Sequence, residues 1–382
     1  MAGPILGASL DELRRDRTSV KWQRYGPDVL PLWIAEMDAR PCPAVVEAVD
    51  AAVRRGDTGY AWTGVYADAF AEHAAATWGW RPDPDSTVRV TDVLTGITHL
   101  LGLLTDPGGP VVLTTPVYNA FFEVVEAAGR RVVEAPLDAD HRLDLDSLAK
   151  AFATATTGGT RSILLLSNPH NPTGTVHTAE ELAAVARLAD EHGVRVVSDE
   201  IHGALVYSSS TFTPYLTVPG TERGIVVSSA SKAWNLAGLK AAVIVPGPDA
   251  AGDVRRLHPF VTFGASHLGV IAHVAAWRDG REWLARLVAE LDANRTLLAR
   301  LVAERLPGAR LVVPEATYLA WLDLRGLGLG DRPATRLVDT ARVALSDGPT
   351  FGAAGAGHAR LNFAASPDLL TEAVDRIAGS LG

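Results

Sequence analysis

The segment that decides the fold is Ser228-Ser229-Ala230-Ser231-Lys232-Ala233-Trp234-Asn235-Leu236-Ala237-Gly238-Leu239-Lys240, which follows an apolar strand candidate. A lysine at a helix start opposes the helix dipole, so Lys232 is badly placed for stability alone. Enclosure by Trp234 and apolar residues can depress the pKa of this lysine, as an amine nucleophile requires. Serine hydroxyls and helix-start amides suit an anion such as phosphate. The run therefore predicts a reactive lysine beside an anion site; the alternative is a surface lysine next to a serine-rich turn.

Short apolar segments alternate with helical patterns on both sides of this run. The predicted strands are Thr87–Thr91, Pro110–Thr114, Arg131–Ala135, Arg161–Ser167, Val194–Ser198, Gly224–Ser229 and Ala241–Pro246. Continuous apolar runs are typical of strands buried on both faces of a mostly parallel sheet. The clearest helix is Thr178–His192, where Thr178 and Glu181 form a capping box and Gly193 ends the helix. The alternation predicts one large α/β domain over residues 44–255, with helices on both faces of the sheet.

The pattern of predicted helices and strands changes after residue 255. A long helix with an apolar stripe is expected first, then strands and helices without strict alternation. The predicted elements are the helix Arg281–Arg305, the strands Arg310–Val313, Thr317–Leu324 and Ala359–Phe363, and a closing helix Pro367–Leu381. This mixture indicates a smaller α+β domain over residues 256–382. We expect residues 1–43 to form an N-terminal segment that packs on this smaller domain.

Composition limits the partners of the chain. The formal charge of −9, from 35 basic and 44 acidic residues, argues against a nucleic-acid surface, because phosphate binding needs a basic patch. Cys42 is the only cysteine, so no intrachain disulfide can form, which fits a reducing compartment. No apolar run resembles a signal peptide or reaches the ~20 residues that span a bilayer. We expect a soluble cytoplasmic protein without nucleic-acid or membrane partners.

Four further residues carry side chains suited to chemistry. Asn171 lies between two prolines in the loop 167–174, at the end of a predicted strand, where α/β folds bind ligands; the alternative is a plain turn. Asp199 also follows a strand and can pair with a cation above the sheet edge, or lie in a solvated acidic turn. His202 is either a donor to the same ligand or a core histidine. Arg360 can bind a carboxylate through two parallel hydrogen bonds, or lie on the surface of a strand.

The order and spacing of these residues resemble one enzyme family. Asp199 lies 28 residues after Asn171, Lys232 lies 33 after Asp199, and Arg360 lies 128 after Lys232. This arrangement resembles fold-type I pyridoxal 5′-phosphate (PLP) enzymes of the class I/II aminotransferase family, over roughly residues 20–380. The resemblance implies an α/β fold with a mostly parallel seven-stranded sheet in the large domain and a smaller α+β domain. It also implies PLP as cofactor, an amino acid as substrate, no metal, and a homodimer with shared active sites.

The resemblance assigns roles to residues. Lys232 would hold PLP as a Schiff base and move the substrate's α-proton, and Asp199 would keep the pyridine nitrogen protonated. Asn171 would bind the ring's 3′-oxygen and Tyr118 would stack on the ring. Arg360 would bind the substrate's α-carboxylate, and Trp33 and Asn171 would be further substrate contacts. The implied phosphate ligands are Gly96, Ile97, Thr98, Ser229, Ser231 and Lys240, with Tyr60 reaching in from the neighbouring subunit. His202 stands where many relatives carry a tyrosine that faces the 3′-oxygen.

Finer motifs resemble the cystathionine β-lyase-type C–S lyases, the MalY- and PatB-like branch. They are Lys21-Trp22, Leu30–Asp38, Ser198–His202, Trp234–Leu239, Glu315–Asp323 and Phe351-Gly352. That branch cleaves the bond between the β-carbon and sulfur of substrates such as cystathionine, releasing a thiol, pyruvate and ammonia. Glu36, Asn119-Ala120 and Trp234 depart from the usual residues and leave the substrate open. A true aminotransferase is the alternative. A non-catalytic PLP-binding regulator is disfavoured, since the chain has no helix-turn-helix segment and no basic face.

Overall fold

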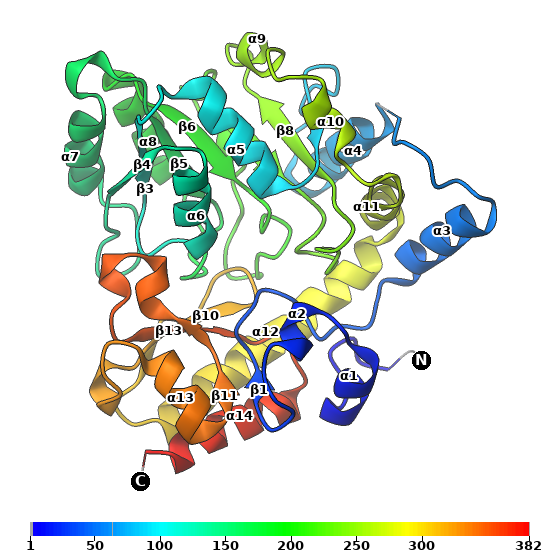
Figure 1. The fold of residues 1–382 in the computed structure, drawn as a ribbon, viewed down its shortest axis with the longest axis vertical. Helices are drawn as coiled ribbons and strands as arrows, with labels where there is room; N and C mark the ends of the chain where they lie inside the picture. Colours follow the sequence, from blue (N-terminus) through cyan, green and yellow to red (C-terminus); the bar gives the residue numbers. More distant parts are fainter. Residues whose placement is uncertain (1–2, 63, 382) are drawn as a thin grey trace.

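A seven-stranded sheet forms the centre of the larger body of the protein (Figure 1). The computed structural model describes residues 3–62 and 64–381. The strands, in spatial order, are β2 (Val88–Val90), β8 (Ala242–Pro246), β7 (Ile225–Ser228), β6 (Arg195–Asp199), β5 (Ile163–Ser167), β3 (Pro110–Leu113) and β4 (Arg131–Glu134). Only β8 runs opposite to the others within this sheet. All seven strands predicted from the sequence are confirmed, as is the mostly parallel sheet.

Helices cover both faces of the sheet, which explains the continuous apolar strands. Along β5, Ile163 and Leu165 belong to one buried cluster, while Leu164 and Leu166 belong to the other, as the two-residue period of a strand requires. The first cluster lies under α5 (Val93–Leu104), α6 (Asn119–Ala127), α9 (Ala251–Val254) and α10 (Phe260–Phe263). The second lies under α4 (Val65–Trp78), α7 (Leu145–Ala155), α8 (Ala179–Glu191) and α11 (His267–Asp279). The predicted capping box between Thr178 and Glu181 is present at the start of α8.

The smaller body combines the end of the chain with its beginning. Its antiparallel sheet has the order β12 (Ser346–Asp347), β13 (His358–Asn362), β10 (Leu319–Asp323) and β9 (Arg310–Leu311). A second sheet pairs β1 (Leu30–Pro31) with β11 (Val343–Ala344) in parallel, so the N-terminal segment joins the C-terminal part. The helices here are α1 (Leu10–Asp16), α2 (Val20–Gln23), α12 (Arg281–Arg305), α13 (Pro333–Ala341) and α14 (Pro367–Gly379). The sequence missed β1, β11 and β12, because two-residue strands show no periodicity.

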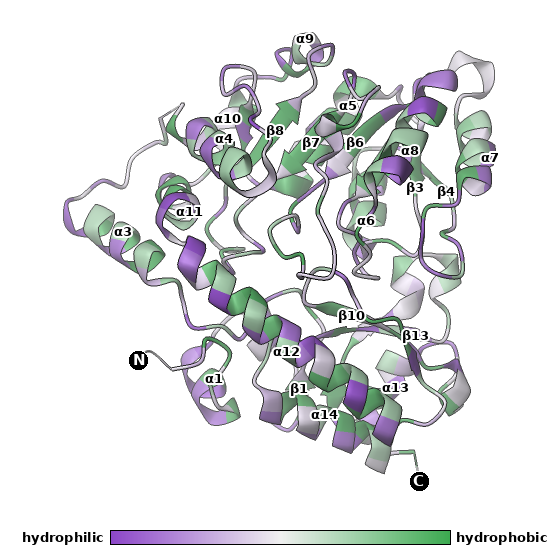
Figure 2. Ribbon diagram, turned by 180° about the vertical axis from the view of Figure 1, so that it is seen from behind, coloured by the Kyte–Doolittle hydropathy of each residue, from purple (hydrophilic) through white to green (hydrophobic). Residues whose placement is uncertain are grey.

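The helix α12 connects the two bodies. It has the predicted bounds, and its residues Trp283, Leu284, Leu287 and Leu291 are buried. Figure 2 shows it from behind, running from the larger body to the smaller with hydrophobic and hydrophilic residues in alternation. The preceding helix α11 packs against α4 and against α3 (Pro43–Arg54) of the larger body. The domain divisions at residues 43/44 and 255/256 remain a prediction.

The segment after β7 differs from the sequence expectation, since Lys232 lies in a series of turns and not at a helix start. Asn235 adopts a left-handed conformation with φ of 57°, which a continuing helix cannot accommodate. Its side chain is bound to the backbone of Met37 through Oδ1 and Nδ2, both at 2.9 Å. Trp234 is anchored by a hydrogen bond from its indole nitrogen to the Gly280 carbonyl, 3.2 Å away. Contacts with distant segments therefore replace the expected helix.

Candidate active site

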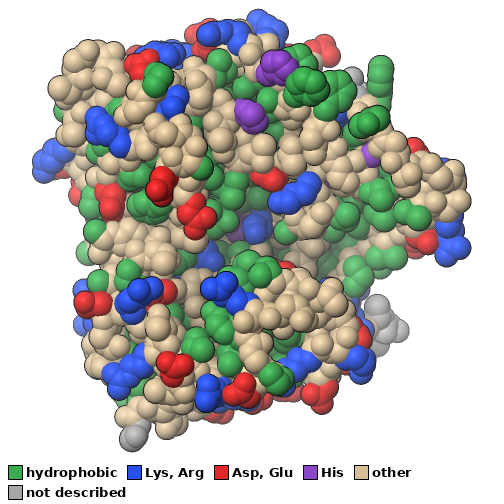
Figure 3. Space-filling model, in the orientation of Figure 1, with side chains coloured by type: hydrophobic (Ala, Val, Ile, Leu, Met, Phe, Trp, Pro, Cys, Tyr) green, Lys and Arg blue, Asp and Glu red, His purple; other side chains and the backbone are tan. Residues whose placement is uncertain are grey.

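A cavity opens at the carboxyl ends of β5, β6 and β7. Figure 3 shows the hollow between the two bodies, with Lys or Arg side chains inside it. The lining residues are Ala35, Asp92, Val93, Leu94, Tyr118, Ser167, Asn171, Asp199, Ile201, His202, Ser231, Lys232, Ala237, Leu239, Lys240 and Ala241. This is the edge of an α/β sheet at which ligands bind. Seven of the fourteen predicted site residues therefore meet in one place, namely Lys232, Asp199, Tyr118, Asn171, His202, Ser231 and Lys240.

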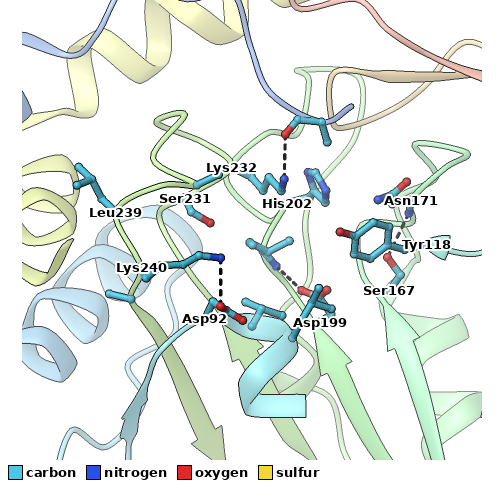
Figure 4. Close-up of a pocket in the computed structure, with 16 residues that line it drawn as sticks. Asp92, Tyr118, Ser167, Asn171, Asp199, His202, Ser231, Lys232, Leu239 and Lys240 are labelled. Carbon is cyan, nitrogen blue, oxygen red and sulfur yellow. Dashed lines mark hydrogen bonds and ion pairs between the residues drawn. The ribbon is translucent and has the colours of Figure 1, made fainter. Parts of the chain in front are cut away.

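Figure 4 shows how the labelled side chains surround this cavity. Lys232 and His202 lie on one side, and Asp92 and Asp199 lie on the opposite side. Tyr118 and Asn171 close one end, and Lys240 lies at the other. In this arrangement a flat ligand would find a positive charge for an anionic end at Lys240 and a carboxyl group for a cationic ring at Asp199.

Lys232 offers a partly neutral amine. Its Nζ donates a hydrogen bond to the Ala35 carbonyl, 2.9 Å away. Burial lowers the pKa of Lys232 to about 8; the positive charge of Arg360 acts in the same direction, and the carboxylate of Asp199 opposes it. A lysine with this pKa is a competent nucleophile and base near neutral pH.

Asp199 is the last residue of β6 and borders the cavity. Its Oδ1 accepts a hydrogen bond from the backbone N–H of Ile201 at 3.1 Å, and no donor to Oδ2 is found within residues 3–62 and 64–381. Burial raises the pKa of Asp199 to about 7. A buried carboxyl group with a free oxygen is suited to a cationic partner held above the sheet edge.

The neighbouring carboxyl group, Glu200, is structural, and sequence reasoning did not single it out. Its Oε1 accepts hydrogen bonds from Ser198 Oγ at 3.0 Å, Asn168 Nδ2 at 3.3 Å and the Tyr215 amide at 2.7 Å. It thereby ties β6 to the loop after β5 and to the segment that precedes β7. Burial raises the pKa of Glu200 to about 8. Its bonding partners fix the backbone on which Asp199 stands.

Arg360 reaches the site from β13 of the smaller body. Its guanidinium donates to Asn171 Oδ1 at 2.9 Å, to the Trp33 carbonyl at 3.2 Å and to Ser346 Oγ at 3.1 Å. It lies over the Phe351 ring, 4.9 Å from the centroid. Within the described part of the chain its hydrogen-bond partners include no carboxylate, and its buried Nε has no partner. Burial lowers the pKa of Arg360 to about 10. A buried guanidinium without an acidic partner is suited to a substrate carboxylate.

Tyr118 and His202 are uncharged members of the lining. Tyr118 directly precedes α6, and burial raises the pKa of its phenol, so the group stays protonated. Burial lowers the pKa of His202 to about 3, with the charges of Lys232 and Arg360 acting in the same direction. His202 Nδ1 is buried and has no hydrogen-bond partner within the described chain. The imidazole is therefore neutral in this site.

The helix-start amides that border the cavity, here called the cradle, lie one turn earlier in α5 than the residues predicted as anion ligands. Gly96 and Ile97 are buried in the core, and the hydroxyl of Thr98 donates to the Leu94 carbonyl at 2.8 Å, so none of the three lines the cavity. The Gly96 amide donates to the Asp92 carbonyl at 2.9 Å within the helix. The first amides of a helix lack intrahelical partners, which leaves those of Val93 and Leu94. These two residues line the cavity and replace Gly96, Ile97 and Thr98 as the candidate anion ligands.

Ser231 and Lys240 line the cavity, whereas Ser229 holds the neighbouring turn in place. Ser231 lines the cavity, but Ser229 does not, because its hydroxyl donates to the Ala241 carbonyl at 2.7 Å. Ser229 Oγ also accepts a hydrogen bond from the Ser231 amide at 3.1 Å, so it fixes the turn. Lys240 lines the cavity, and its Nζ pairs with Asp92 Oδ2 at 3.1 Å.

Two further predicted residues do not reach the cavity with their side chains within one chain. Tyr60 is 91% exposed, and its neighbour Trp62 is 80% exposed. The Trp33 ring packs edge-on against Tyr25, 6.0 Å between centroids, with Arg24 over its face. Only the carbonyl of Trp33 takes part in the site, as an acceptor for Arg360.

Two other kinds of site were sought in the described residues. No group of three or more His, Cys, Asp or Glu side chains there is placed to hold a metal ion. No helix within residues 3–62 and 64–381 has the length and apolarity needed to cross a bilayer.

Comparison with known proteins agrees with this geometry. A protein of Mycobacterium tuberculosis named "Putative cystathionine beta-lyase" is 49% identical, and the alignment covers 99% of this chain and 98% of the relative. The cystathionine beta-lyase of Corynebacterium glutamicum is 36% identical over 97% of this chain and 99% of its own length. The PLP-bound C–S lyase from Staphylococcus hominis superimposes with a TM-score of 0.90 at 28% identity, covering 98% of this chain and 99% of that structure. The family profile described as aminotransferase class I and II matches residues 27–377. The chain therefore belongs to the aminotransferase class I and II family.

Proposed function

We propose that this protein is a PLP-dependent C–S β-lyase that converts S-substituted cysteines such as cystathionine, with one molecule of water, into a thiol, pyruvate and ammonia. The observation that carries the proposal is that Lys232 and Asp199 line one cavity, while the guanidinium of Arg360, which has no acidic partner among the described residues, is bound to Asn171 of the same lining. The cystathionine beta-lyase and C–S lyase names of the similar proteins support the choice of reaction. The alternative is an aminotransferase of amino acids.

The residues present fit PLP. The free oxygen of Asp199 suits a protonated pyridine nitrogen, and Tyr118 would cover the ring face. Asn171 would bind the ring's 3′-oxygen. The phosphate would be held by the cradle amides of Val93 and Leu94, the hydroxyl of Ser231 and the charge of Lys240. When bound to Lys232, PLP would withdraw electrons from the bonds at the substrate's α-carbon.

The chain's own groups would then handle the substrate. Arg360 would bind the α-carboxylate in parallel hydrogen bonds and fix the α-carbon near the cavity. The amine of Lys232, with its lowered pKa, would accept the α-proton. The departing sulfur needs a proton, and Tyr118, Tyr60 of the partner chain and Lys232 are the candidate donors. Tyr118 and Lys232 line the cavity of one chain, whereas Tyr60 would come from the partner chain.

The products distinguish the two reactions. We expect thiol, pyruvate and ammonia in equal amounts from cystathionine or an S-alkyl cysteine, without an added keto acid, because a thiolate is a good leaving group. A thiol reagent and a pyruvate assay measure both products in one reaction. Alanine is the matched control, since it lacks a β-substituent that can leave. Turnover that depends on a keto acid and releases no thiol would replace the lyase proposal with the aminotransferase. Pyruvate alone decides nothing, because alanine transamination also forms it.

We also propose a homodimer whose active sites combine residues of both chains. Four large hydrophobic side chains are exposed on neighbouring segments: Tyr60 at 91%, Trp62 at 80%, Phe260 at 78% and Phe263 at 59%. Arg89 links these segments through hydrogen bonds to the carbonyls of Ala61 and Thr262, both at 3.2 Å. Hydrophobic side chains gather near α10 in Figure 3. An apolar patch of this kind is typical of a protein interface, and a second copy is its proposed occupant. The cytoplasmic location remains a prediction.

Mixed dimers test this arrangement. Tyr60→Phe and Lys232→Ala chains are unfolded or dissociated together and reassembled. In a hybrid dimer both defects fall in one site, so the other site is intact. Random assembly should restore about one quarter of the wild-type activity, above the level of either variant alone. A mixture no more active than its two separate components, or an active monomer in sedimentation, would contradict the shared site.

A further inference from the structure

The backbone of residues 33–37, here called the strap, borders the active-site cavity and is held by side chains from both bodies. Each of its five carbonyls accepts at least one side-chain hydrogen bond. The donors are Arg360 and Ser346 to Trp33, Asn362 to Ile34, Lys232 and Tyr318 to Ala35, Asn362 and Lys21 to Glu36, and Asn235 to Met37. The strap is therefore fixed in position relative to the cavity.

One of these carbonyls is shared. The Ala35 oxygen accepts from Lys232 Nζ at 2.9 Å and from the hydroxyl of Tyr318 at 3.0 Å. The bond from Lys232 is drawn as a dashed line in Figure 4. Tyr318 is fully buried and precedes β10 of the smaller body. A carbonyl has two lone pairs, so both donors can bind at once, and each then receives a smaller share of its electron density.

We propose that Tyr318 is a positioning residue that shares the Ala35 carbonyl with Lys232, fixing this acceptor and weakening its hold on the protonated amine. A hydrogen bond that favours the charged form of a group disfavours its loss of the proton. By engaging one lone pair, the Tyr318 hydroxyl limits that effect and helps to keep the amine neutral and reactive. The inference rests on the proposed role of Lys232 as the reactive amine.

The other charged groups near Lys232 do not depend on Tyr318. Arg360 and Lys240 disfavour the protonated amine by charge repulsion, while Asp199 and Glu36 favour it. The neutral groups beside it are His202, whose ring lies 6.1 Å from that of Tyr318, and Tyr118 on the cavity wall. Removal of the Tyr318 hydroxyl changes none of these charges. Any change in the titration of Lys232 would then report on the shared carbonyl.

The test is the pKa of Lys232 in the cofactor-free full-length chain of the Tyr318→Phe variant. Acetic anhydride at limiting concentration labels neutral amines, and mass spectrometry of the peptide that contains Lys232 gives its labelling rate at each pH. We expect the apparent pKa to rise by about half a unit, so that labelling at pH 7 falls about threefold. The measurement needs no turnover, so its outcome is independent of whether the enzyme proves to be a lyase.

Tyr207→Phe is the matched control. Tyr207 is also buried, and its hydroxyl donates to a backbone carbonyl, that of Thr317, without contacting the strap. Both variants lose one buried hydrogen bond, and thermal unfolding should show similar losses of stability. A raised pKa of Lys232 in Tyr318→Phe alone supports the proposal. An unchanged or lowered pKa, or an equal rise in Tyr207→Phe, overturns it.

Discussion

Replacing Lys232 by alanine is expected to lower turnover by about 10⁴-fold, because the variant loses both the covalent attachment of PLP and the base for the α-proton. The phosphate cradle and Asp199 remain in this variant, so it should still bind PLP without the covalent bond. Steady-state kinetics measures the loss, and absorbance in the visible range follows the cofactor.

Borohydride reduction of the yellow wild-type protein should fix PLP on the peptide that contains Lys232. Lys150, an exposed residue of α7, provides the control, since Lys150→Ala should keep both the label and the turnover. Label on Lys21, Lys150 or Lys240, or no label at all, would end the assignment of Lys232. Near-normal turnover of Lys232→Ala would do the same.

Replacing Asp199 by alanine is expected to lower turnover by about 10²- to 10³-fold while the protein still folds. Without this carboxylate, the pyridine nitrogen of bound PLP would lose its proton more easily and the ring would withdraw electrons less well. Burial already raises the pKa of Asp199 to about 7 in the cofactor-free protein, and a cationic ring nitrogen beside it would lower that pKa again. The turnover number and the thermal unfolding temperature measure the two effects separately.

Asn171→Ala is the comparison for this variant. Asn171 also lines the cavity, but its proposed contact with PLP is one hydrogen bond, and its Oδ1 accepts one more from Arg360, so we expect a loss of about tenfold. An Asp199→Ala protein that keeps near-normal turnover would refute the role of the carboxylate. A loss no greater than that of Asn171→Ala would show that Asp199 contributes no more than an ordinary polar contact.

The sequence determined the features that depend on local patterning. The seven strands of the large sheet were predicted because each is a short apolar run, and burial under helices on both faces requires such runs. The capping box of α8 and the bounds of α12 could also be predicted from the sequence, since each depends on residues within a few helical turns. Lys232, Asp199 and Asn171 were identifiable because each follows a strand whose carboxyl end faces the same sheet edge.

Only the tertiary structure decided which groups face the cavity. The cradle lies at Val93 and Leu94, because Gly96 is packed against Val90 and Ile244 in the core. Lys232 stands in a turn and not at a helix start, because Asn235 binds the strap nearly two hundred residues earlier in the chain.

Arg360 on β13 and Tyr318, directly before β10, reach the strap from the smaller body, and the carbonyls that they bind carry no side-chain signature. Backbone carbonyls are present at every residue, so their pairing with distant donors is fixed by the way the two bodies pack. The sequence therefore predicted side chains that meet at one cavity, while the packing of the chain determined their hydrogen-bond partners, their protonation and the polar atoms left free for a ligand.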